Sequence, residues 1–139
     1  MRNLLLASTL ACLGFAPLHA GTVTTIVDKS DQMMVVLVDD IPIYTWDVST
    51  GAKYRWTPIG VFGVQSMHAD HYSSKYNNAP MPHSIFFNGN IAIHGTDKVE
   101  RLGHMDSKGC VRLSRKNAMV LFELVLTHGR QNTTIIVQD

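Results

Sequence analysis

One cysteine and one histidine of this 139-residue chain stand in surroundings that suit nucleophilic chemistry. An apolar run over residues 91–93 ends at His94, and a glycine follows, which lets neighbouring backbone approach the ring closely. Residues 107–113 read Ser-Lys-Gly-Cys-Val-Arg-Leu and place Cys110 directly after another glycine. A thiol attacks as its thiolate, and histidine titrates close enough to neutral pH to take the proton. We therefore expect Cys110 to be a nucleophile and His94 its base.

Groups next to this pair suit supporting roles. The Gly95 carbonyl is placed to orient the second ring nitrogen of the histidine, as the third member of a catalytic triad does. Gly109 lets backbone N–H groups converge on an oxyanion. Lys108 and Arg112 bring positive charge toward the thiol, which favours thiolate. Each residue alone also has an ordinary structural explanation, so the prediction rests on their combination.

The first 20 residues predict a secretory signal peptide. A positively charged start precedes an apolar run over residues 4–16, which is too short to span a bilayer comfortably, and the segment closes with Pro-Leu-His-Ala. We expect an exported protein of the periplasm or cell wall that begins at Gly21. Cleavage removes Cys12 and leaves Cys110 with no partner for an internal disulfide.

The composition describes one ordinary globular domain, which we expect over residues 21–139. Hydrophobic residues make up 45% of the chain and charged residues 17%, so neither a disordered nor a membrane-embedded chain is indicated. The formal net charge of +1 does not suggest a nucleic-acid partner.

Most of the domain reads as β-structure. β-Branched and apolar runs, separated by turn residues, predict strands over 22–27, 33–38, 41–48, 61–67, 84–87, 91–93 and 133–137. Asp39-Asp40 and the Asn-Gly-Asn sequence at 88–90 predict hairpin turns. The polar stretch over 69–82 is long for a connection, which favours a functional loop or lid.

One helix is expected late in the chain. Ser114 is a good N-cap, and Gly129 suits the C-terminal end. Between them, one helical face collects the apolar residues Ala118, Leu121, Phe122, Val125 and Leu126.

These motifs together resemble the catalytic domain of the L,D-transpeptidases, which has the YkuD-type fold. The signature of that family is a His-Gly or His-Ser pair, a loop, and then Ser-His-Gly-Cys followed by an apolar residue and Arg or Asn. Here the pair is at 94–95 and the second motif at 107–112. Residues 48–51, 57–60 and 81–82 match as well, and the resemblance extends from Thr22 to Asp139.

The resemblance implies a mainly-β fold, a YkuD-like β-sandwich with one late α-helix, and an enzyme without cofactor or metal. The family acts on peptidoglycan stem peptides in cell wall biogenesis, and carbapenem inhibitors acylate it. The thiolate, here Cys110, attacks the third residue of a tetrapeptide stem and expels the terminal D-Ala. An amine of a second stem then resolves the thioester, which gives a 3→3 cross-link.

Further residue roles follow from the resemblance alone. Ser107, with Gly109, supports the nucleophile loop. The substrate site is expected to involve Arg112, Met81, His83 and Lys108. Lys108 stands where the family usually has histidine; that histidine is not the base, so we expect Lys108 to act electrostatically. His104 lies in the same loop and is a candidate replacement.

Other readings use the same residues. Hydrolysis of the thioester would make the chain an L,D-carboxypeptidase or an endopeptidase. A sortase also combines His, Cys and Arg in a β-fold, but the motif and helix placement fit it less well. A metal site of His94, His104 and Cys110 lacks the close ligand pairs usual for zinc. A wall-binding module without catalysis has no need for a lone thiol near a His-Gly strand end.

Overall fold

The computed structural model describes residue 14 and residues 21–139. The predicted leader therefore lies almost wholly outside the described residues and stays a prediction. The elements of the described part, in chain order, are β1 (Val23–Asp28), β2 (Met33–Val38), β3 (Ile41–Asp47), β4 (Gly60–Phe62), β5 (Ser66–Tyr72), β6 (Pro80–Asn88), β7 (Ile91–Thr96), the 3-10 turn η1 (Val99–Arg101), β8 (Val111–Ser114), α1 (Arg115–His128), the 3-10 turn η2 (Arg130–Asn132) and β9 (Thr133–Gln138). The prediction of a mainly-β fold with one late helix is confirmed.

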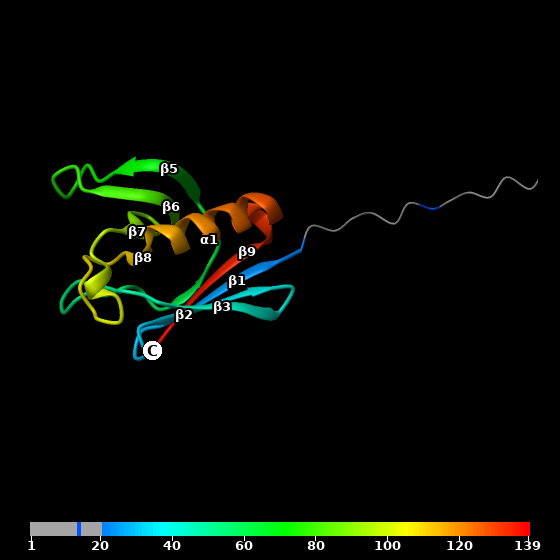
Figure 1. Cartoon of the computed structure of the whole chain (residues 1–139), viewed down its shortest axis with the longest axis horizontal. Helices are drawn as coiled ribbons and strands as arrows, with labels where there is room; N and C mark the ends of the chain where they lie inside the picture. Colours follow the sequence, from blue (N-terminus) through cyan, green and yellow to red (C-terminus); the bar gives the residue numbers. More distant parts are fainter. Residues whose placement is uncertain (1–13, 15–20) are drawn as a thin grey trace, which may run out of the picture.

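Two sheets make up the domain, one of five strands in the order β3-β2-β1-β9-β4 and one of four in the order β5-β6-β7-β8. Figure 1 shows the sheets lying apart with α1 between them, and α1 contacts β6, β7, β8 and β1. Two strand pairs are parallel, β1 with β9 and β7 with β8. The second parallel pair forms one edge of the smaller sheet.

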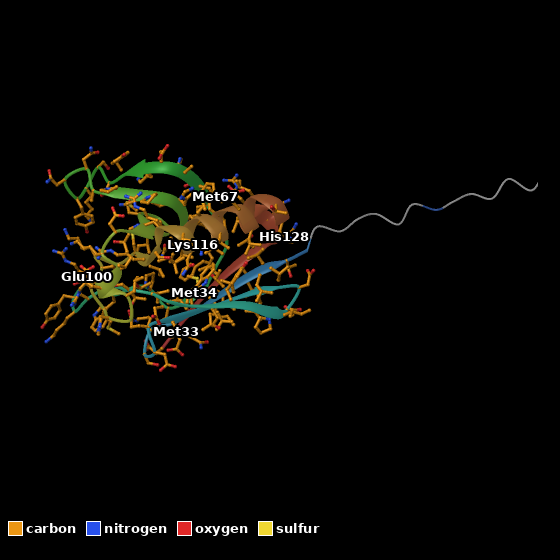
Figure 2. The ribbon with its side chains drawn as sticks, viewed as in Figure 1. Met33, Met34, Met67, Glu100, Lys116 and His128 are labelled. Atoms are coloured by element: carbon orange, nitrogen blue, oxygen red, sulfur yellow. The ribbon has the colours of Figure 1, made fainter. Side chains whose placement is uncertain are left out.

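The core fills the space between the sheets and the helix. In β1 the side chains alternate strictly, with Val23, Thr25 and Val27 buried, which is the pattern of a strand with one covered face. Met34 of β2 is fully buried and lies centrally in Figure 2. From the smaller sheet, Phe87 and Ile93 join the same apolar cluster.

The helix begins and ends where the sequence predicts. The Ser114 hydroxyl accepts a hydrogen bond from the Asn117 N–H at 3.2 Å, and Gly129 follows the last turn with φ of 96°. Four of the five expected core residues are buried. The prediction that Leu126 belongs to the core is wrong, because this side chain is 56% exposed. Leu126 follows the buried Val125 by one residue, which rotates it by about 100° around the helix axis, away from the core.

Both predicted hairpins are present. β2 and β3 are joined through Asp39 and Asp40, whose positive φ values of 50° and 63° suit a tight turn between twisted strands. β6 and β7 are joined through Gly89, with φ of 57°.

Three expectations for the middle of the chain are wrong. The single strand predicted over 61–67 is two strands, β4 and β5, which belong to different sheets on either side of Gly63. The predicted loop over 69–82 is shorter, because β5 runs to Tyr72 and β6 starts at Pro80. Its polar sequence reflects an exposed edge strand. Residues 111–114, for which the sequence predicted no strand, form β8.

Within the described residues, no helix has the length and apolar character needed to cross a membrane.

Truncation of the buried helix face tests this packing. Leu121 is 1% exposed, so Leu121→Ala removes core contacts and leaves a cavity. We expect it to lower the free energy of unfolding by about 2–5 kcal/mol. Leu126→Ala, on the exposed side of the same helix, is the matched control and should change that free energy by only about 0.5 kcal/mol. Urea denaturation followed by circular dichroism measures both, and equal losses would contradict the assigned helix orientation.

Candidate active site

His94 is fixed by its strand and by its own next residue. It lies in β7, is 6% exposed and pairs in register with Arg112 of the parallel strand β8. Its Nδ1 lies 2.8 Å from the Gly95 carbonyl oxygen. Because a carbonyl only accepts, Nδ1 carries the hydrogen and donates, which leaves Nε2 with its lone pair free to take a proton.

The surroundings keep this imidazole neutral. Burial lowers the pKa of His94 from 6.5 to about 4; the Gly95 carbonyl opposes this shift, and the positive charge of Arg112 and of His71 adds to it. At neutral pH the ring is therefore an unprotonated base.

Gly95 is required by close packing. A Cβ there would lie 3.1 Å from both the Arg115 Cα and the Pro82 Cγ, so one of these neighbours would have to shift by a few tenths of an ångström to admit a side chain. The absence of a side chain at Gly95 thus allows α1 to pack closely against β7, next to the His94 ring.

Cys110 ends the loop that precedes β8 and is partly buried. Its Sγ accepts from the Ala92 N–H at 3.5 Å and faces the Asn90 carbonyl oxygen at 3.8 Å. Burial raises the pKa of the Cys110 thiol, while the Ala92 N–H and the Arg112 guanidinium lower it and offset that rise only in part. The resting thiol is therefore protonated.

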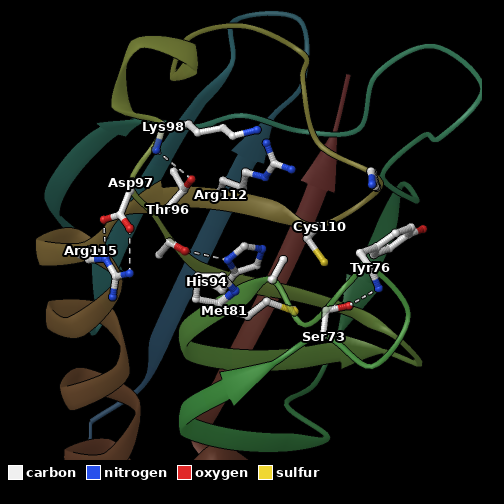
Figure 3. A pocket seen from close by; sticks show the side chains of 14 residues that line it. Ser73, Tyr76, Met81, His94, Thr96, Asp97, Lys98, Cys110, Arg112 and Arg115 are labelled. Carbon is white, nitrogen blue, oxygen red and sulfur yellow. Dashed lines mark hydrogen bonds and ion pairs between the residues drawn. The ribbon is translucent and has the colours of Figure 1, made fainter.

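The thiol and the imidazole share one cavity, yet no hydrogen bond joins them among the described residues. Figure 3 shows His94 and Cys110 as neighbours at the cavity, with the Cys110 sulfur directed away from the ring. Catalytic hydrogen bonds are commonly long or absent before substrate binds. Rotation about the Cys110 side-chain bond is needed to direct Sγ toward Nε2.

Side-chain hydroxyls hold the nucleophile loop in place. Ser107 donates to the Cys110 carbonyl and accepts from the Gly109 N–H at 3.1 Å. Thr57 donates to the Gly109 carbonyl at 2.7 Å and accepts from the Gly51 N–H at 2.9 Å. The Gly109 N–H is thus already occupied. Of the backbone donors expected to bind an oxyanion, the Cys110 N–H remains, since none of the loop and side-chain hydrogen bonds of the described residues engages it.

The cavity has a volume of about 320 Å³ and is lined by Ser73, Tyr76, Ala79, Pro80, Met81, His94, Gly95, Thr96, Asp97, Lys98, Lys108, Cys110, Arg112 and Arg115. Of the predicted substrate residues, Met81, Arg112 and Lys108 lie on it. His83 does not: its ring packs edge-on against Phe122 of α1, with centroids 5.3 Å apart. The backbone of His83 has a positive φ of 52°, which is unusual for a strand residue, and its side chain lies against the helix rather than in the cavity.

Cys110 also lines a second, smaller cavity of about 90 Å³ on its other side. His71 and Asn90 lie there, while Met81 and Tyr76 line both cavities. The sulfur thus stands between two hollows.

Lys108 makes a contact that its sequence position does not suggest. Its Nζ lies 4.2 Å from the centre of the Tyr76 ring, so the ammonium holds the 73–79 loop against the 104–110 loop. The cation that lowers the pKa of the thiol is Arg112. His104 is exposed and lies outside both cavities.

Several residues that line the cavity were not predicted from the sequence. Tyr76 lies in the stretch flagged as a functional loop, so composition indicated the segment but not the residue. Asp97 and Lys98 directly follow the His-Gly strand, and their position after it was a usable signal. Within the described residues, no three His, Cys, Asp or Glu side chains are grouped to hold a metal ion.

The two cations near the loop predict different effects on the thiol. Arg112→Gln should move the pH midpoint of Cys110 alkylation upward, because the guanidinium stabilises thiolate. Lys108→Met should move it much less, since the ammonium lies over Tyr76. The alkylation rate against pH, read by intact mass, measures both. A larger shift for Lys108→Met would contradict this assignment.

Comparison with known proteins agrees with the geometry. A family model of the L,D-transpeptidase catalytic domain, YkuD, matches residues 22–137. A comparison with curated proteins gave no match.

Solved structures resemble the chain over most of its length. An L,D-transpeptidase from Mycobacterium smegmatis is 21% identical with a TM-score of 0.75, covering 86% of this chain and 59% of that one. One from Stackebrandtia nassauensis is 25% identical with a TM-score of 0.74, covering 85% and 56%. L,D-transpeptidase 3 from Mycobacterium tuberculosis, solved with a faropenem-derived adduct, is 18% identical with a TM-score of 0.73, covering 86% and 61%.

The chain thus spans somewhat under two thirds of the length of these structures. The family model covers nearly all of the described domain. The chain belongs to the family of L,D-transpeptidase catalytic domains with the YkuD fold.

Proposed function

We propose that this chain forms 3→3 peptidoglycan cross-links through a thioester at Cys110, with tetrapeptide stems as acyl donors. The proposal rests mainly on the protonation state of His94, which lines the same cavity as Cys110. His94 donates from Nδ1 to the Gly95 carbonyl, so Nε2 is left as a neutral base. Membership of the family supplies the substrate class.

In the first half-reaction, the Cys110 thiol passes its proton to Nε2 of His94 as Sγ attacks the carbonyl carbon of stem residue three. The carbonyl oxygen becomes an oxyanion, and the Cys110 N–H is the candidate backbone donor to it. The imidazolium then gives its proton to the departing amine of the terminal D-Ala. The C–N bond breaks, and residue three remains joined to Sγ as a thioester.

In the second half-reaction, an amine of another stem attacks the thioester carbonyl. His94 takes a proton from that amine and returns one to the sulfur, so the new amide forms and the free thiol is regenerated. Water in place of the amine would give hydrolysis by the same site. The products of reaction therefore separate a transpeptidase from an L,D-carboxypeptidase.

The cavity suits a peptide donor with acidic groups. Lys98, Lys108 and Arg112 contribute positive charge around the thiol, and Met81 and Tyr76 provide apolar wall. The faropenem-derived adduct of one structural neighbour supports testing a β-lactam as a donor analogue on this chain.

Removal of the nucleophile tests the chemistry directly. The protein is incubated with a purified tetrapeptide stem and, separately, with imipenem, and is followed by intact-mass analysis. We expect one acyl adduct per chain on the wild type, none on Cys110→Ala, and a cross-linked stem dimer among the wild-type products. An adduct on Cys110→Ala would refute the assignment. Tripeptide with no dimer would show hydrolysis in place of transfer.

The base assignment predicts a difference between histidines. His94→Ala should slow acylation by on the order of 10²–10⁴-fold, because it removes the proton acceptor in the cavity. His104→Ala is the matched control in the same part of the fold and should stay near wild type, since that side chain is exposed outside the cavity. Stopped-flow or quenched acylation with imipenem gives both rates. Similar rates for the two variants would exclude His94 as the base.

A further inference from the structure

The cavity beside Cys110 carries an excess of positive charge. Four cationic side chains line it, and Asp97 is the one acidic residue among the lining. Asp97 is committed to Arg115 through a two-pronged ion pair, with Nη2 at 2.8 Å from Oδ2. Three cations, Lys98, Lys108 and Arg112, are left without full neutralisation at the cavity.

Two of these three are positioned to act on a ligand. The ammonium of Lys108 is engaged over the Tyr76 ring. Arg112 contacts Asp106 at 3.3 Å, but that carboxylate is shared with Arg101 at the same distance. Lys98 forms no ion pair within the part of the chain that the structure describes. Lys98 thus keeps its full positive charge, and Arg112 keeps part of its charge because its one carboxylate partner is shared.

These two side chains line the same cavity. In the view of Figure 3, Lys98 and Arg112 both lie on one side of His94. Lys98 is held at the end of β7, where its N–H donates to the Thr96 hydroxyl at 3.1 Å, and Arg112 projects from the adjacent strand β8. Like charges that line one cavity raise each other's energy, and a bound anion relieves this repulsion.

The reaction places an anion near these two side chains. Arg112 is the register partner of His94, so this cation lies on the histidine side of the thiol. His94 hands its proton to the amine of the leaving residue, which must therefore lie beside the imidazole. The carboxylate of that residue is one carbon away from its amine. When the leaving residue is the last of the stem, this carboxylate is free and negatively charged.

We propose that Lys98 and Arg112 bind the free terminal carboxylate of the leaving residue, and that Lys98 determines specificity for donors with this group. The inference rests on the proposed function and narrows it. A site that requires a terminal carboxylate releases a single end residue. It disfavours cleavage inside a longer chain, where the next residue is joined by a neutral amide.

The test compares two donors that differ in one charge. One is the tetrapeptide stem with a free C-terminal carboxylate, and the other is the same stem with a C-terminal amide. Mass spectrometry follows release of D-Ala or D-Ala amide, and kcat and KM are measured for each. Charge-assisted hydrogen bonds contribute enough that wild type should prefer the free acid by about 10- to 100-fold in kcat/KM.

Variants separate the charge of Lys98 from its packing. Lys98→Gln should lower kcat/KM for the free acid by about tenfold, mainly through KM, and affect the amide donor much less. Lys98→Arg should keep the preference, because the charge is retained. Lys116→Gln is the matched control: this exposed lysine of α1 lies outside the cavity and should leave the preference intact.

The outcomes are distinct. Equal use of both donors by wild type, or an equal loss on both donors in Lys98→Gln, overturns the carboxylate site while the proposed function stands. Release from neither donor by wild type overturns the proposed function, and this inference with it.

Discussion

The parallel pairing of β7 with β8 is the constraint on which the site depends. Its register sets His94 opposite Arg112 and Ile93 opposite Val111, so Cys110, one residue before β8, reaches the level of Ala92. A parallel pair needs a long crossover, and here residues 97–110 supply it without a helix of more than one 3-10 turn. The crossover therefore carries the nucleophile itself.

A crossover with so little regular structure has to be held by other means. Isolated bridges join Ser49 to Arg112 and Gly51 to Ser107, and the Ser49 hydroxyl donates to the His104 carbonyl at 2.7 Å. A Cβ on Gly51 would overlap the Arg55 carbonyl oxygen, so the contact admits no side chain. The segments around residues 48–51 and 57–60, remote from the chemistry in sequence, thus fix the position of the thiol.

The candidate catalytic residues were easier to predict from the sequence than the residues that surround them. His94, Gly95 and Cys110 stand in local patterns of glycine and apolar residues, and those patterns are sufficient to propose a pair. The hydrophobic periodicity likewise indicated the strands with one covered face, β1 and β2, and the buried face of α1. Such signals are local, so a single sequence reveals them.

Features that depend on tertiary contacts could not be predicted from the sequence. β5 is an exposed edge strand with polar side chains, so alternation was lost and the segment looked like loop. β8 has four residues and is defined by its partner β7. His83 has a positive φ and packs against Phe122, and Lys108 contacts an aromatic ring 32 positions earlier in the chain. No local pattern specifies these pairings.

The direction of the Cys110 sulfur has a consequence for chemical durability. With its proton retained and its sulfur directed toward the Ala92 N–H and the Asn90 carbonyl, the side chain presents little thiolate to solvent. Peroxides and simple electrophiles react with the thiolate form, so oxidation to sulfenic acid is slowed in the unoccupied enzyme. On the proposed mechanism, the sulfur becomes reactive only when a bound donor brings it close to His94, so the lifetime of the thiol would depend on the presence of the donor.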